Sequence, residues 1–149
     1  MKKIYLSPSS QPANTYAGLS TNEQEVCRDI ARELATDLKR CGFEVKCGDY
    51  GTMYDRVKES NEWKADLHMP IHTNAFDGKV SGTRLMALDL TGKGFQVCQA
   101  VLESLDKITP GTSSNITANP GLYEIKAAVA PTCYVEVDFH DVPKVAKWL

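Results

Sequence analysis

Hydrophobic residues recur along the chain with two different spacings, one typical of helices and one typical of strands. Val26, Ile30, Leu34 and Leu38 lie every four residues, which predicts an amphipathic helix. Other stretches are short and apolar, or alternate apolar with polar residues, as β-strands do. The strands are expected at residues 3–6, 43–47, 66–71, 83–88, 122–125 and 132–138, and the helices at 20–41, 52–63, 94–105 and from 141 or 142 to 149.

This alternation of strands and helices predicts an α/β fold. We expect a mainly parallel, twisted sheet of about six strands with helices on both faces. Residues 109–121, TPGTSSNITANPG, have the composition of a loop, and this loop is too short to separate two domains. We therefore expect one domain over residues 1–149. Its last helix is expected to be truncated at Leu149, and a helix of about eight residues is marginal unless it packs.

The first long helix begins with a pattern that gives Glu23 a possible structural function. Ser20 followed by Glu23 fits a capping box, in which both side chains satisfy free backbone N–H groups. Lys39 and Arg40 suit the negative C-terminal end of the helix, and Gly42 ends it. Capping is therefore an alternative to any chemical function of Glu23.

Composition and charge exclude several classes of protein. The formal net charge is −2 and the pI is about 5.9, so nucleic acid is not expected as a partner. No apolar run reaches about 18 residues, so no membrane-spanning segment is expected. The start, MKKIYLSPSS, lacks the apolar core of a secretory signal. The five cysteines form no CxxC motif, which favours free thiols in a reducing compartment.

Two histidines in the stretch ADLHMPIHTNAF have different expected functions. Pro70 separates His68 from His72 and argues against a helix there. On a strand the two histidines share a face but lie roughly 13 Å apart, too far for one metal ion. Because sites in parallel sheets form at the carboxyl ends of strands, we interpret His72 as functional. His68 is expected to be a core histidine with a hydrogen-bond partner.

Several short motifs, in their order and spacing, resemble one enzyme family. Arg56 and Asn61 match an arginine–asparagine pair that precedes the strand with the histidine. The other motifs are NEQEVCRDIA at 22–31, IHTNA at 71–75, GTRLM at 82–86 and APTCYVEVDF at 130–139. Together they resemble the zinc-dependent N-acetylmuramoyl-L-alanine amidases of type 3, which include cell-wall amidases and catalytic domains of phage endolysins.

The resemblance implies a reaction and a set of site residues. The family cleaves the amide between N-acetylmuramic acid and L-alanine in peptidoglycan, and uses one zinc ion held by His, Glu and His. By this resemblance Glu23 and His72 are expected to be zinc ligands, and Glu136 the general base. Zinc polarises the amide and activates water, and a nearby carboxylate moves the proton. The partner is then peptidoglycan or a muropeptide.

The chain departs from the family at its first zinc histidine. The family has that histidine in a D-P-G-H-G segment, but the corresponding segment here is LSPSSQ, with Ser10 in the histidine position. Our hypothesis is that His140 supplies the third ligand. Gln11 is the rival third ligand, although an amide oxygen binds zinc weakly compared with imidazole. A further alternative is that His140 only orients a ligand.

Two functions remain open on the sequence alone. The first is a zinc amidase acting on the bacterial cell wall, for which Asn74 could bind substrate or merely cap a turn. The second is a non-catalytic domain of the same fold that binds wall fragments or a protein partner. Without an export signal, an active enzyme is expected to be cytoplasmic or to be released to the wall by phage-type lysis.

Overall fold

The fold is a single six-stranded sheet with helices on both faces. The computed structural model describes residues 1–149. The strands have the order β2-β1-β3-β6-β4-β5, and every neighbouring pair is parallel except β4 with β6. The predicted α/β fold is therefore confirmed. The elements are β1 (Lys3–Pro8), α1 (Glu23–Arg40), β2 (Glu44–Cys47), α2 (Met53–Glu62), β3 (Leu67–Asn74), β4 (Arg84–Ala87), α3 (Lys93–Leu105), β5 (Asn115–Ala118), α4 (Tyr123–Ala127), β6 (Tyr134–Phe139) and α5 (Pro143–Trp148).

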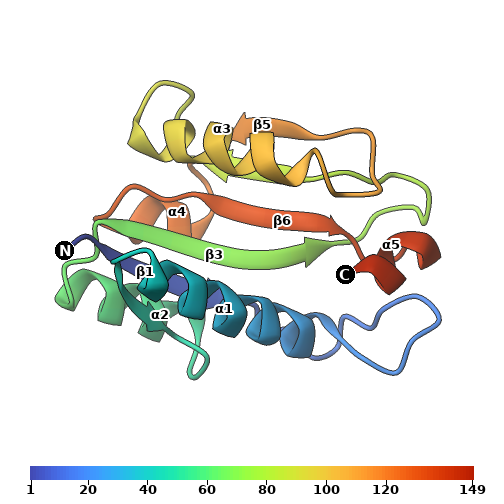
Figure 1. Cartoon of the computed structure of the whole chain (residues 1–149), viewed down its shortest axis with the longest axis horizontal. Helices are drawn as coiled ribbons and strands as arrows, with labels where there is room; N and C mark the ends of the chain where they lie inside the picture. The colour runs from blue at the N-terminus through green and yellow to red at the C-terminus, as the bar shows by residue number, and fades with distance from the viewer.

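The two faces of the sheet differ in chemistry because side chains alternate along each strand. Strands β3 and β6 form the middle of the sheet, and α1 and α3 lie against one face (Figure 1). That face is apolar: Leu6, Met69, Ile71 and Val135 belong to a cluster of 13 buried hydrophobic residues. Burying each such side chain stabilises the fold by roughly 1.5–3 kcal/mol.

The opposite face, against α2 and α4, holds buried polar side chains. His68 of β3 bonds to Ser60 of α2 and to Glu124 of α4, and Ser7 of β1 also bonds to Glu124. The prediction that His68 is a core histidine with hydrogen-bond partners is therefore confirmed. Ser7, His68 and Glu124 therefore form a buried polar network on this face.

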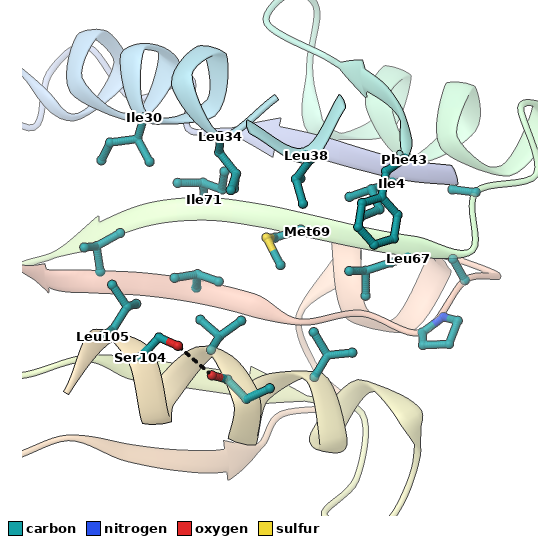
Figure 2. Close-up of a pocket in the computed structure, with 18 of the residues that line it drawn as sticks. Ile4, Ile30, Leu34, Leu38, Phe43, Leu67, Met69, Ile71, Ser104 and Leu105 are labelled. Carbon is teal, nitrogen blue, oxygen red and sulfur yellow. Dashed lines mark hydrogen bonds between the residues drawn. The ribbon is translucent and has the colours of Figure 1, made fainter. Parts of the chain in front are cut away.

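A broad apolar groove lies on the α1 and α3 face, away from this polar network. Its volume is about 1360 Å³. Figure 2 shows Leu34 and Leu38 of α1, Met69 of β3 and Leu105 of α3 around the groove. We refer to this space between α1 and α3 as the α1–α3 groove. No helix of the chain is both long and apolar enough to cross a bilayer.

Two short elements differ from the sequence prediction. Residues 115–118, expected to be a loop, form edge strand β5, which pairs in parallel with β4. Its side chains are mostly exposed, so the sequence shows no hydrophobic pattern there. The strand is evident from its backbone pairing with β4. Residues 122–125 were expected to be a strand, but Tyr123–Ala127 is helix α4. A five-residue helix is too short to show a helical period.

The start of α1 also differs from the expected capping box. Asn22, rather than Ser20, is the N-cap, and its side chain accepts a hydrogen bond from the backbone N–H of Glu25 at 3.1 Å. Glu23 is therefore the first residue of the helix and its carboxylate is free to turn toward the sheet. The capping alternative for Glu23, with Ser20 as the N-cap, is therefore wrong.

Candidate functional site

Glu23 and His72 meet at the carboxyl end of β3. Glu23 Oε1 lies 2.9 Å from His72 Nδ1, and the residues are 1% and 8% exposed. The backbone N–H of Thr73 also points to Glu23 Oε1, at 3.4 Å. A carboxylate is favoured at the N-terminal end of α1, because the helix dipole is positive there. The structure therefore brings these two predicted site residues into direct contact.

The protonation of this pair follows from its neighbours. Burial alone would lower the pKa of His72, but the carboxylates of Glu124 and Glu23 raise it to about 9. Burial would raise the pKa of Glu23, but hydrogen bonds from His72 and Asn14 lower it overall. In the absence of a cation, His72 is therefore an imidazolium between carboxylates.

Glu136 lies beside this pair on the neighbouring strand. It is the direct partner of His72 in the pairing of β6 with β3, and the ring of Tyr134, two residues earlier, stacks on His72 at 4.8 Å. Glu136 Oε2 is buried and has no hydrogen-bond partner. Burial raises the pKa of Glu136 to about 7, although His72 opposes this rise. A carboxyl group with such a pKa can accept and return a proton near neutral pH.

The loop after β1 supplies amide groups instead of an imidazole. Gln11 Nε2 lies 3.4 Å from His72 Nδ1, and Asn14 Nδ2 donates to Glu23 Oε2 at 2.6 Å. Asn14 also donates to Gln11 Oε1 at 3.2 Å. Ser10 is held elsewhere, because its hydroxyl accepts a hydrogen bond from Arg56. Gln11, not Ser10, is therefore the β1 loop residue next to His72.

His140 is connected to Glu23 only indirectly, through Thr73. Its Nδ1 is 2.9 Å from Thr73 Oγ1, and its ring stacks on Tyr16 with 5.0 Å between centroids. It is 3% exposed and forms no hydrogen bond or ion pair with Glu23 or His72. Burial lowers the pKa of His140. The structure therefore places His140 where it supports Thr73, while its predicted metal ligation stays a prediction.

Asn74 closes β3 by capping the turn that follows. Its Oδ1 accepts from the backbone N–H of Ala75 at 2.9 Å, and its carbonyl accepts from the backbone N–H of His140 at 2.8 Å. These contacts match the structural alternative for Asn74. Its predicted binding of substrate stays a prediction.

The chemistry of the donor atoms decides whether these residues fit a zinc ion. No group of three His, Cys, Asp or Glu side chains is arranged to hold a metal. However, a carboxylate oxygen of Glu23 and a nitrogen of His72 adjoin, and the Gln11 amide reaches the same nitrogen. Zinc accepts carboxylate and imidazole ligands, and an amide oxygen can complete an O/N donor set. The residues fit a cation if Gln11 turns its oxygen toward it.

The sequence prediction missed two polar residues of the site. Asn14 gives no signal, because an asparagine in a polar loop is ordinary. Glu124 gives a weak one: in the sequence LYEI it is the one charged residue among apolar and aromatic residues. Its carboxylate is 4% exposed and lies 4.0 Å from His72 Nε2.

The charge on His72 makes the free energy of unfolding of the metal-free protein depend on pH. Its folded pKa is about 9 against an ordinary value of 6.5, so its stabilising effect is full below pH 6.5 and is lost as pH rises through about 9. Between about pH 6 and about pH 9.5 we expect the free energy of unfolding to fall by roughly 1–3 kcal/mol. Urea unfolding of the wild type and of His72→Gln measures this. Equal pH dependence in the two proteins would contradict the assignment.

Comparison with known proteins identifies the family and the fold of the chain. The family model described as N-acetylmuramoyl-L-alanine amidase matches residues 10–149. No curated protein sequence matches the chain. Among solved structures, Cwp6 from Clostridium difficile is 20% identical with a TM-score of 0.85, over 98% of this chain but 26% of its own, so this chain spans about a quarter of that protein.

Two catalytic domains match over most of their own length. The domain of CwlV, an N-acetylmuramoyl-L-alanine amidase from Bacillus (Paenibacillus) polymyxa var. colistinus, is 17% identical with a TM-score of 0.79, over 99% of this chain and 86% of its own. The domain of the CD27L endolysin targeting Clostridia Difficile is 15% identical with a TM-score of 0.82, over 100% of this chain and 88% of its own. These likenesses show the fold, and the family model covers nearly the whole chain. The chain therefore belongs to the N-acetylmuramoyl-L-alanine amidase family, a family of hydrolases.

Proposed function

We propose that this protein hydrolyses the amide bond between N-acetylmuramic acid and L-alanine in peptidoglycan. One observation above all supports the proposal: Glu23, His72 and Glu136, distant in sequence, adjoin at the carboxyl ends of β3 and β6. Membership of the amidase family supplies the substrate class. A non-catalytic domain would gain nothing from Glu136 Oε2, a buried carboxylate oxygen without a partner that costs stability.

The residues that would hold a zinc ion are Glu23, His72 and Gln11. His72 would bind through Nδ1, because that nitrogen faces both Glu23 Oε1 and the Gln11 amide. Asn14 donates a hydrogen bond to Oε2 of Glu23, which fixes the orientation of the carboxylate. When bound, zinc would polarise the scissile carbonyl and make water a better nucleophile.

Glu136 would move the proton in this reaction. Glu136 is next to His72 in the strand pairing and its Oε2 has no hydrogen-bond partner, so it could accept a proton from the attacking water. It would then donate that proton to the amine of L-alanine as the amide bond breaks. Tyr134 walls the site beneath the His72 ring and keeps water away from that side.

Metal analysis and digestion of peptidoglycan test the proposal together. The purified protein is expected to bind one zinc ion and to release new amino groups of L-alanine from isolated cell walls, without releasing reducing sugar ends. Mass spectrometry of the soluble products then shows stem peptides that begin with L-alanine. Binding of walls with no released amine would instead identify a non-catalytic domain. The matched control is His72→Ala, which should lose both zinc and release.

A further inference from the structure

We propose that Glu124 is a positioning residue that orients His72 for the metal, by holding the far side of its ring from α4. This inference rests on the proposed function, because it concerns the same metal site. Glu124 touches neither Glu23 nor Glu136 in any hydrogen bond, so it would act through His72 alone.

The two ring nitrogens of His72 lie next to different carboxylates. His72 Nδ1 lies 2.9 Å from Glu23 Oε1, while Nε2 lies 4.0 Å from Glu124 Oε2. The ring is therefore held between two carboxylates, one at each nitrogen. A histidine that binds a metal through one nitrogen commonly donates its other N–H to a carboxylate, which fixes the tautomer and the ring orientation. Glu124 Oε2 lies on that side of the ring, within ion-pair distance of Nε2 but beyond the length of a direct hydrogen bond.

Glu124 is itself held in place by side chains of neighbouring elements. Its other oxygen, Oε1, accepts a hydrogen bond from the Ser7 hydroxyl and lies 3.2 Å from His68 Nε2. His68 Nδ1 in turn lies 3.0 Å from Ser60 Oγ, and the His68 ring stacks on Tyr5. These partners come from β1, β3 and α2, all regular elements. Glu124 is therefore held by rigid parts of the fold and not by a loop.

The burial of the Glu124 carboxylate is costly for the fold. Glu124 is 4% exposed and forms no ion pair with lysine or arginine; its ion-pair partners are the imidazoles of His68 and His72. A buried carboxylate costs several kcal/mol of desolvation unless it is well paired. An apolar side chain would fill this position on α4 more cheaply. The cost is understandable if Glu124 serves the imidazole that lies between it and the metal.

Asp138 provides a matched control. It is also fully buried, and its carboxylate accepts backbone hydrogen bonds from Gly82 at 2.6 Å and from Phe139 at 2.7 Å. It bonds to no imidazole of the site. Asp138→Asn therefore removes a buried charge that supports the fold alone, whereas Glu124→Gln removes one of similar burial next to His72.

Zinc affinity is the decisive measurement, taken by competition with a coloured chelator and compared with the unfolding midpoint of each variant. We expect Glu124→Gln to weaken zinc binding about tenfold and to change the visible spectrum of the cobalt-substituted protein. Glu124→Asp, which keeps the charge, should lie between Gln and the wild type. Asp138→Asn should lower the unfolding midpoint while its zinc affinity stays within about twofold of the wild type.

The outcomes separate this inference from the proposed function. If the wild type binds zinc and Glu124→Gln binds it equally well, Glu124 is only structural and the inference is wrong, while the proposed function stands. If Glu124→Gln does not fold, Glu124→Asp decides in the same way. If the wild type binds no zinc, the proposed metal site itself is wrong and the inference with it.

Discussion

Replacing Glu136 with glutamine is expected to abolish hydrolysis and, at the same time, to stabilise the metal-free protein at neutral pH. The loss of activity follows because an amide cannot accept the proton of the attacking water. A well-placed general base is typically worth about 10²- to 10⁴-fold in rate. Release of L-alanine amino groups from cell walls measures this loss, and zinc affinity should stay close to that of the wild type.

The gain in stability follows from the raised pKa of Glu136. The group titrates near 7 in the folded chain against an ordinary value of 4.5, so the folded state binds its proton more tightly than the unfolded state does. Its favourable effect is full below pH 4.5 and is lost as pH rises through about 7. At about pH 8 the glutamine variant should therefore be more stable by roughly 1–3 kcal/mol.

Urea unfolding of both proteins at about pH 5 and about pH 8 checks the second half of this prediction. The difference between them should be small at the lower pH and should grow at the higher one. A variant that loses activity but is less stable at both values would show that Glu136 is a structural residue. Opposite effects on activity and stability are typical of a catalytic group held in an environment that is unfavourable for its charge.

Gln11→Ala is expected to weaken zinc binding far more than His140→Ala. The Gln11 amide lies 3.4 Å from His72 Nδ1, whereas His140 Nδ1 is engaged with Thr73. The binding free energy of zinc is about 10 kcal/mol or more and is divided among its ligands. Loss of one of three protein ligands should therefore reduce zinc affinity by about 10- to 100-fold. For His140→Ala we expect a change of less than about threefold.

Calorimetric titration with zinc measures both affinities, and Gln11→His serves as a positive control. An imidazole binds zinc more strongly than an amide oxygen does, so this variant should bind zinc more tightly than the wild type. The reverse order, with His140→Ala losing zinc and Gln11→Ala keeping it, would restore His140 as the third ligand.

Much of this arrangement could be predicted from the sequence. The alternation of strand and helix patterns predicted the sheet, and the rule for carboxyl ends of parallel strands separated His72 from His68. Pro70 was informative because it excluded a helix between them. These features are local in sequence or follow from one general rule of topology.

The remaining features depend on contacts between distant segments. Asn22 and Ser20 both suit an N-cap, and tertiary packing of Glu23 against His72 decides between them. Likewise β5 has no hydrophobic pattern that predicts a strand, because only Ile116 packs toward the core and the backbone pairs with β4. Glu124 is buried beside His72 through a five-residue helix, and no spacing rule connects the two positions.

The division of β3 between an apolar face and a polar face has a consequence for how the gene can vary. Ile71 lies on the apolar face against α1 and α3, and the next residue, His72, lies on the polar one. Inserting or deleting one residue before them would exchange the two faces along the strand. The imidazole would then lie among aliphatic side chains, and an isoleucine would face Glu23. Homologous genes should therefore tolerate substitutions in this strand far better than changes in its length.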